Sequence, residues 1–271
     1  MKLSCSTLPF KDWSFPATVE FCKSHGISGL ELRIALNDWS TLDLSDESIA
    51  EMRKILADND MVITNLGSSI CLRGYSDEQF NEFIKCAELA QKLDAPAIRF
   101  FLGNFIVNWD DEVASIDEAG IIEFLQKACD YGAERNVAIW IETHNEYSEG
   151  STLRELLDKI DRPNCAIIWD IIHPLELGES IADTIQYIGG DIAHIHVKDG
   201  VPFDDTNKAN YKYTKLGDGV VPIHEIVKLL NETGFDGFYS LEWENTWRAE
   251  IAHIQAEEII PEFAEYMKTA D

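Results

Sequence analysis

Four acidic or imidazole side chains stand at the carboxyl ends of successive apolar runs in the second half of the sequence. They are Glu142 in AIWIETH, Asp170 in AIIWDIIH, His196 in IAHIHVKD and Glu242 in FYSLEWE. A polar group beside a buried strand needs a partner, because an unpaired charge is expensive to remove from water. Three carboxylates and an imidazole that converge on one point repel one another unless a cation lies between them. The pattern therefore predicts a shared divalent metal ion.

The ligand types narrow the choice of metal. Three oxygen donors with one nitrogen donor suit Mn²⁺, Mg²⁺, Co²⁺ or Zn²⁺, and the hard oxygens favour Mn²⁺. A thiolate-rich zinc site is not indicated, because the six cysteines stand singly without a C-x-x-C pair and are expected to be reduced core thiols. Glu244 lies on the same strand face as Glu242 and is the alternative ligand. We prefer Glu242 because it directly follows the apolar run.

Eight short apolar runs alternate with longer amphipathic stretches along the chain. As strands they cover Lys2–Thr7, Gly29–Arg33, Val62–Gly67, Ala97–Leu102, Ala138–Glu142, Ala166–Asp170, Ile192–Val197 and Phe238–Glu242. Such near-continuous hydrophobicity is typical of parallel strands that helices cover. Eight strand–helix units at a spacing of about 30 residues predict an α/β protein with a closed (β/α)8 barrel. The alternative, a doubly wound open sheet, lacks its G-x-G-x-x-G fingerprint.

The segments between the strands carry helix and loop signals. The run Ser76–Gln79 is a capping box that opens a helix through about Leu93. No linker rich in proline, glycine or serine divides the chain, so we expect one domain over residues 1–271. Two long loops, Asn104–Ser115 and Gly200–Val221, follow the fourth and seventh strands. In a barrel they lie on the catalytic face, where they are either lids or plain surface loops.

The motifs around the four candidate ligands resemble the sugar phosphate isomerase/epimerase family, a group of xylose isomerase-like TIM barrels. IETH, WDxxHP, HIHVKDG, LGDG with a following proline, and GFDGFYSLEWE carry the resemblance, with GISGLELR and AIRFFLG nearer the N-terminus. The resemblance covers nearly the whole chain. It implies metal ligands at Glu142, Asp170, His196 and Glu242, and a substrate-binding histidine at His173.

Such a site implies proton transfer next to a carbonyl group. A metal with open positions chelates vicinal oxygens of a hydroxy-ketone and stabilises the enediolate. Glu142 and Glu242 are the predicted catalytic proton carriers, since a monodentate carboxylate keeps one oxygen free. Proton exchange from two faces gives epimerisation, and a shuttle between adjacent carbons gives aldose–ketose isomerisation. The alternative is a dehydratase of the inosose or dehydroshikimate type, in which a β-hydroxyl leaves after the proton is removed.

Four further side chains are candidates for binding the substrate, namely His173, Lys198, His144 and Arg99. Lys198 and His144 each lie two residues beyond a predicted ligand, so they point to the same side of the strand as that ligand. Arg99 lies on the fourth strand, and its alternative role is a structural pair with Glu142 or Glu31 inside the barrel.

The charge balance excludes several partners. The chain has 22 Lys and Arg against 49 Asp and Glu, a formal net charge of −27, which repels nucleic acid and anionic membranes. The negative net charge also argues against an abasic-site endonuclease. No apolar run approaches the roughly 18 residues that span a bilayer, and no signal peptide is evident. We therefore expect a cytoplasmic enzyme with a small-molecule carbohydrate substrate, and a homo-oligomer is compatible with the sequence.

Overall fold

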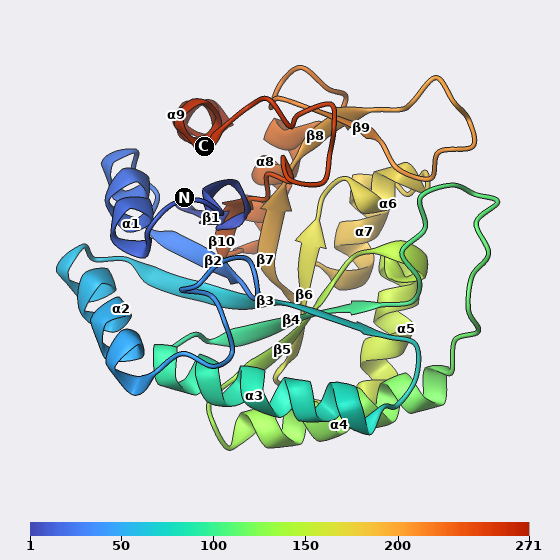
Figure 1. Ribbon diagram of the computed structural model, residues 1–271. Coiled ribbons are helices and arrows are strands. Elements are labelled where there is room, and N and C mark those ends of the chain that lie inside the picture. The colour runs from blue at the N-terminus through green and yellow to red at the C-terminus, as the bar shows by residue number, and fades with distance from the viewer. Residues whose placement is uncertain (271) are drawn as a thin grey trace.

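A closed barrel of eight parallel strands forms the centre of the protein, which a computed structural model describes for residues 1–270 (Figure 1). The strands are β1 (Lys2–Ser6), β2 (Gly29–Arg33), β3 (Val62–Leu72), β4 (Ala97–Leu102), β5 (Ala138–Glu142), β6 (Cys165–Asp170), β7 (Ile192–Val197) and β10 (Phe238–Leu241). They follow one another around the barrel in this order, and β10 pairs with β1 to close it. The predicted (β/α)8 class is confirmed. Asp271, the last residue of the predicted domain, lies outside the described residues.

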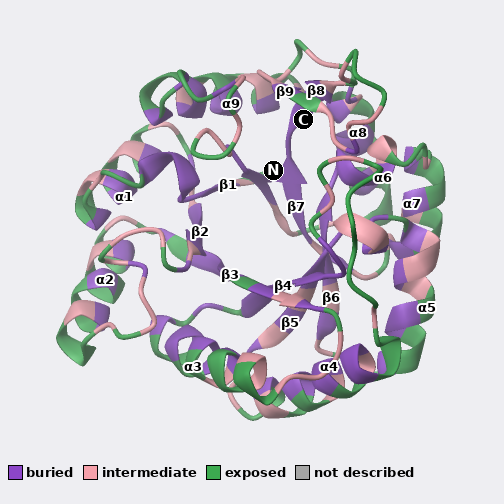
Figure 2. Cartoon of the chain, turned by 45° about the vertical axis from the view of Figure 1, so that its right-hand side comes forward, coloured by how far each residue is buried: buried purple, intermediate pink, exposed green. Residues whose placement is uncertain are grey.

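Helices surround the barrel with their buried sides turned toward the strands and their exposed sides outward (Figure 2). They are α1 (Phe15–Ser24), α2 (Asp46–Asp58), α3 (Asp77–Leu93), α4 (Glu118–Ala133), α5 (Gly150–Ile160), α6 (His173–Glu176), α7 (Ile181–Ile188), α8 (Ile223–Thr233) and α9 (Ala256–Ala270). Short 3₁₀ turns, η1 (Leu8–Phe10) and η2 (Asn145–Tyr147), follow β1 and β5. Among residues 1–270, no helix has the length and apolar character needed to cross a membrane.

Local sequence signals explain where several elements begin and end. The Ser76 side chain accepts a hydrogen bond from the Gln79 backbone N–H at 3.3 Å, so the predicted capping box is confirmed. The strand after Val62 runs five residues further than predicted, to Leu72. Its pairing with β4 stops after Gly67 and resumes at Cys71 with a register shift, and the polar serines in that gap hide the continuation from a hydrophobicity pattern.

The second of the two long loops contains more structure than the sequence predicted. A short hairpin of β8 (Asp199–Val201) and β9 (Lys212–Thr214) occupies most of the predicted second loop.

The six cysteines are free as expected, and Cys71 alone among them is half-buried rather than buried.

Candidate metal centre

The four predicted ligands converge at the carboxyl end of the barrel. Glu142 and Asp170 end β5 and β6, His196 lies one residue before the end of β7, and Glu242 directly follows β10. Strand register brings them together, because β6 pairs Asp170 with His196 on β7. One ligand atom from each residue lies within 4.8 Å of the others, and all four side chains are buried.

The donor atoms of this cluster fit a divalent ion. The Nδ1 atom of His196 lies 3.3 Å from Glu242 Oε2, 3.6 Å from Glu142 Oε1 and 4.0 Å from Asp170 Oδ2. This nitrogen is buried and has no hydrogen-bond partner among residues 1–270. One imidazole nitrogen facing three carboxylate oxygens is a donor set that Mn²⁺ and similar ions accept. The roles of the four residues as ligands remain a prediction.

Arg99 supplies a positive charge next to the cluster. Its Nη1 atom is 2.9 Å from Glu242 Oε1, 3.0 Å from Glu142 Oε2 and 3.4 Å from Glu31 Oε1. The side chain is only 1% exposed. The structural pairing considered for Arg99 is therefore present, with two carboxylates of the cluster and with Glu31 at once.

Lys198 is a second protein cation among the same carboxylates. Its Nζ atom lies 2.7 Å from Asp170 Oδ2, 2.5 Å from Glu242 Oε2 and 2.6 Å from Glu244 Oε1. The expectation that a metal ion alone offsets the repulsion between the carboxylates was therefore incomplete. The spacing of residues in the sequence does not show which protein cations lie next to these carboxylates. Glu244 pairs with Lys198 and with Arg248 at 3.2 Å, whereas Glu242 is the residue that joins the four-membered cluster.

Glu31 orients His196 from inside the barrel. Its Oε2 lies 2.7 Å from His196 Nε2 and 3.4 Å from His194 Nε2. Burial opposes the charge of Glu31, but the positive charge of His196 and hydrogen bonds from both histidines hold its pKa well below the usual range. A carboxylate on one ring nitrogen fixes the other toward the cluster, as in sites where histidine binds a metal.

Gly67 on β3 leaves the space that the buried pair of Glu31 and Arg99 requires. A Cβ atom at Gly67 would lie 3.2 Å from Glu31 Oε1 and 3.5 Å from Arg99 Nη2. A larger residue would therefore push the carboxylate or the guanidinium out of place.

His173 and His144 stand side by side at the edge of the cluster, with ring centroids 4.4 Å apart. His173 Nε2 lies 3.3 Å from Asp170 Oδ2, and Nδ1 lies 2.8 Å from Glu176 Oε2. Burial opposes protonation of His173, but these two carboxylates raise its pKa to about 9. Burial and the neighbouring His173 charge lower the pKa of His144 to about 3, so His144 is neutral at neutral pH.

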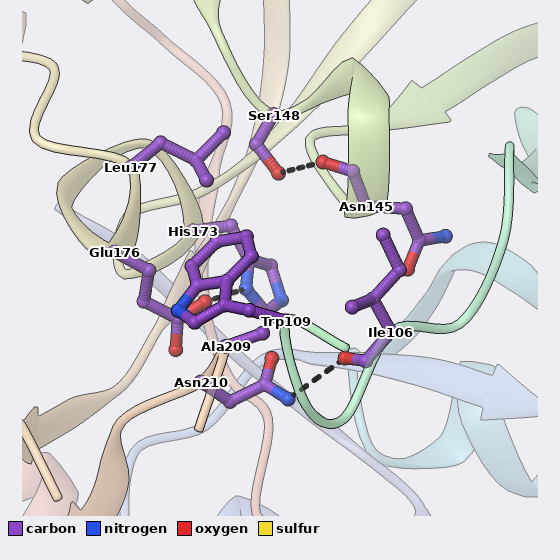
Figure 3. A pocket seen from close by; sticks show the side chains of 9 residues that line it. All are labelled: Ile106, Trp109, Asn145, Ser148, His173, Glu176, Leu177, Ala209 and Asn210. Atoms are coloured by element: carbon purple, nitrogen blue, oxygen red, sulfur yellow. Dashed lines mark hydrogen bonds and ion pairs between the residues drawn. The ribbon is translucent and has the colours of Figure 1, made fainter. Parts of the chain in front are cut away.

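Two cavities open beside the cluster. The larger, of about 460 Å³, reaches Glu142, Glu242 and His144, and its other walls include Phe101 and Trp247. This volume suits a small organic molecule, for which sites of about 300–1,000 Å³ are usual. A much smaller cavity lies beyond His173, where Trp109, Glu176 and Asn145 form its walls (Figure 3).

The two long loops meet above these cavities. The Trp109 N–H donates to Asn207 O at 2.8 Å, and the Ala209 N–H donates to Val107 O at 3.1 Å. The Lys208 ammonium also donates to Asn108 Oδ1 at 2.9 Å. Segments about a hundred residues apart in the sequence therefore form one joined wall of the site.

Asp199 organises the second loop immediately after Lys198. Its two carboxylate oxygens accept four backbone N–H groups, from Gly200 at 2.8 Å, Gly217 at 2.8 Å, Gly219 at 3.0 Å and Val221 at 3.1 Å. A Cβ atom at Gly219 would collide with Asp199 Oδ1, which explains the glycine there. The sequence motifs KDG and LGDG thus fold against each other as a structural unit.

A comparison with known protein families identifies the family of this chain. The sequence model of the xylose isomerase-like TIM barrel family matches residues 19–270. The chain belongs to this family. A 3-dehydroshikimate dehydratase of Bacillus anthracis is 27% identical over 266 residues, covering 90% of this chain and 91% of the relative.

Solved structures of other xylose isomerase-like barrels have the same fold. A D-psicose 3-epimerase determined in the presence of D-fructose superposes with a TM-score of 0.79 and 16% identity, over 100% of this chain and 98% of that chain. The IolI protein with a bound zinc atom gives a TM-score of 0.73 and 18% identity, over 100% and 96% of the two chains. At these identities the likeness concerns the fold.

Sequence reasoning missed some of the residues that line the site of this xylose isomerase-like barrel. Arg33 and Arg248 border the larger cavity but were not candidates. Arg33 had a detectable signal, because it lies two residues after Glu31 at the end of a strand and so points to the same face. Arg248 follows the last strand in a loop, where the alternation of strand side chains does not predict its direction.

Proposed function

We propose that this protein is a divalent-metal-dependent isomerase or epimerase that acts on a sugar or a polyol-derived hydroxy-ketone. The observation that carries the proposal is the pair of buried carboxylates, Glu142 and Glu242, which share one centre with Asp170 and His196 beside a cavity. The donor set favours Mn²⁺ over Mg²⁺, Co²⁺ and Zn²⁺. The D-psicose 3-epimerase with the same fold supports a carbohydrate substrate.

The proposed chemistry is proton transfer at the carbon next to the substrate carbonyl. When bound, the metal would polarise this carbonyl and stabilise the negative charge that develops on its oxygen. Glu142 takes the proton and Glu242 returns one, or the reverse. They stand at the ends of β5 and β10, which β6 and β7 separate in the barrel. Both carboxylates contact the same Arg99 Nη1 atom, and two carboxylates that reach one centre from separate strands suit proton exchange at two faces of one carbon.

The neighbouring residues have proposed supporting roles. Arg99 lines the cavity and is proposed to position both carboxylates, because its Nη1 atom contacts Glu142, Glu242 and Glu31 at once. Lys198, His173 and His144 are proposed to contact substrate oxygens. Neutral His144 either donates or accepts a hydrogen bond there, and the lysine ammonium donates.

Dehydration is the second candidate reaction. In structural superposition, a probable 3-DHS dehydratase from Bacillus anthracis is 22% identical to this chain, and the D-psicose 3-epimerase is 16% identical. The first step is the same removal of a proton next to a carbonyl. The reactions diverge when a β-hydroxyl leaves, which requires an acid to protonate it.

Metal content is the first test. Purified wild-type protein is expected to hold about one equivalent of Mn, Co, Zn or Mg, and a Glu142→Ala/His196→Ala variant is expected to lose it. A wild-type protein that holds no metal and takes up no Mn²⁺ would refute the proposed centre.

The reaction is tested next with Mn²⁺-loaded protein in D₂O. Ketoses, inososes and 3-dehydroshikimate are followed by NMR and mass spectrometry. Isomerisation or epimerisation incorporates deuterium next to the carbonyl and keeps the elements of water, whereas dehydration loses water and creates a conjugated chromophore. Glu142→Gln should abolish turnover, and Glu149→Gln, the same change at an exposed helix cap, should not. Full activity of Glu142→Gln would remove this residue from the mechanism.

A further inference from the structure

One guanidinium in the larger cavity has no carboxylate partner in the described part of the chain. Arg33, the last residue of β2, donates through Nη1 to Ile34 O at 2.8 Å and Gly67 O at 3.0 Å. It donates through Nη2 to Ser69 Oγ at 2.7 Å. All three acceptors are neutral, so these bonds fix the position of Arg33 without neutralising its charge.

The other cations that line this cavity are paired. Arg99 contacts Glu142 and Glu242, and Arg248 contacts Glu244. Arg33 lies instead against the Trp247 ring, with its Cζ atom 5.7 Å from the ring centroid. Arg33 is therefore a cation held in place at the cavity wall and open to a ligand.

The remaining hydrogen-bonding capacity of Arg33 limits what it can bind. A guanidinium has five N–H groups, and the three hydrogen bonds leave Nε–H and one N–H of Nη2 without a protein acceptor. Burial, together with the charge of Arg99, lowers the pKa of Arg33 only to about 10, so the group stays cationic at neutral pH. Glu242, Glu31 and Glu142 act on this charge from a distance, but none of the described carboxylates forms an ion pair with it, so an anionic ligand in direct contact would stabilise it.

Barrel order places Arg33 across the barrel from Asp170, one of the predicted metal ligands. Around the eight strands, β2 is four steps from β6, which ends at Asp170, and two steps from β10, which Glu242 follows. A ligand that reaches both Arg33 and Asp170 must therefore extend across the cavity, with its anionic group at one end and its reacting oxygens at the other.

We infer that Arg33 binds a carboxylate group of the substrate, so that the substrate is a hydroxy-keto acid rather than a neutral sugar. The inference rests on the proposed function and adds the substrate class to it. Two free N–H groups match the two oxygens of one carboxylate. A phosphate ester offers more oxygens and usually meets several backbone N–H groups or a second cation, and Arg99 and Arg248, the other guanidinium groups on this wall, are already paired.

The test measures binding with ligands that differ only at the anionic end. D-fructose, D-fructuronate and D-fructose 6-phosphate share the ketose and differ at the sixth carbon. 3-Dehydroshikimate and its methyl ester form a cyclic pair. Isothermal titration calorimetry of the Mn²⁺-loaded protein should show at least one free acid binding about tenfold to a hundredfold more tightly than its neutral counterpart, as charge-assisted hydrogen bonds provide.

Substitutions then locate the preference. Arg33→Met should bring the ratio of acid to neutral affinity close to one, and Arg33→Lys should retain part of it. Arg73→Met is the matched control, because this exposed arginine follows β3 and does not line the cavity. It should leave the ratio unchanged. If Arg33→Met does not fold, as judged by its melting temperature, the wild-type ratio and Arg33→Lys decide the question.

Several results would overturn the inference. The inference is wrong if acids and their neutral counterparts bind with equal affinity, or if only the phosphate ester binds more tightly. It is also wrong if no ligand binds, or if Arg33→Met keeps the full preference for the acid. Metal content and deuterium exchange with neutral ketoses are measured on the same samples. Normal exchange without acid preference refutes the role of Arg33 and leaves the proposed function standing, whereas absence of metal and exchange refutes the proposed function itself.

Discussion

Replacing Asp199 by asparagine should destabilise the protein strongly although it hardly changes the volume of the side chain. The Asp199 oxygens accept four backbone N–H groups, two on each oxygen, and the residue is buried. An asparagine keeps one oxygen and turns an amide nitrogen toward two of the donors. At least two hydrogen bonds to a charged group are lost, each worth about 1.5–3 kcal/mol, so we expect a loss of about 3–6 kcal/mol in the free energy of unfolding.

Equilibrium unfolding in urea, followed by circular dichroism, measures this loss as a lower midpoint at an unchanged slope. Asp218→Asn is the matched control, because Asp218 lies in the same loop with an exposed side chain. The control should stay within about 0.5 kcal/mol of wild type. If Asp199→Asn unfolds at the wild-type midpoint, the four N–H contacts do not stabilise the loop.

Three further perturbations test the candidate centre. Glu31→Gln should weaken Mn²⁺ binding in calorimetry about tenfold to a hundredfold, as loss of a residue that orients a metal ligand does; unchanged affinity would contradict this role. Gly67→Ala should lower the free energy of unfolding by about 1–3 kcal/mol, because its Cβ crowds the Glu31–Arg99 pair, and a wild-type urea midpoint would argue against the crowding. Mn²⁺ at a hundred times its dissociation constant should stabilise the wild type by about 2.7 kcal/mol in thermal unfolding. The Glu142→Ala/His196→Ala variant should show no such gain, and an equal gain would place the metal elsewhere.

Most of the fold was predictable because each strand is a short apolar run with a helix pattern after it. The bounds Gly29–Arg33, Ala97–Leu102, Ala138–Glu142 and Ile192–Val197 agree with the observed strands. Elements with weak local signals were not predictable. The hairpin of β8 and β9 forms between short polar segments, whose pairing depends on the loop around Asp199 rather than on hydrophobicity.

The gathering of Glu142, Asp170, His196 and Glu242 followed from the sequence alone, since parallel strands of a barrel open on one face and each residue ends such a strand. Position along a strand predicts the face of the sheet but not the partner across it. Only the tertiary structure therefore placed Lys198 among the carboxylates and Glu31 behind His196, and showed that Arg99 pairs with Glu142, an alternative that the sequence had left open. It also decided that the hydrogen-bond acceptors of Arg33 are neutral, because side chains meet across the barrel, between strands far apart in the sequence.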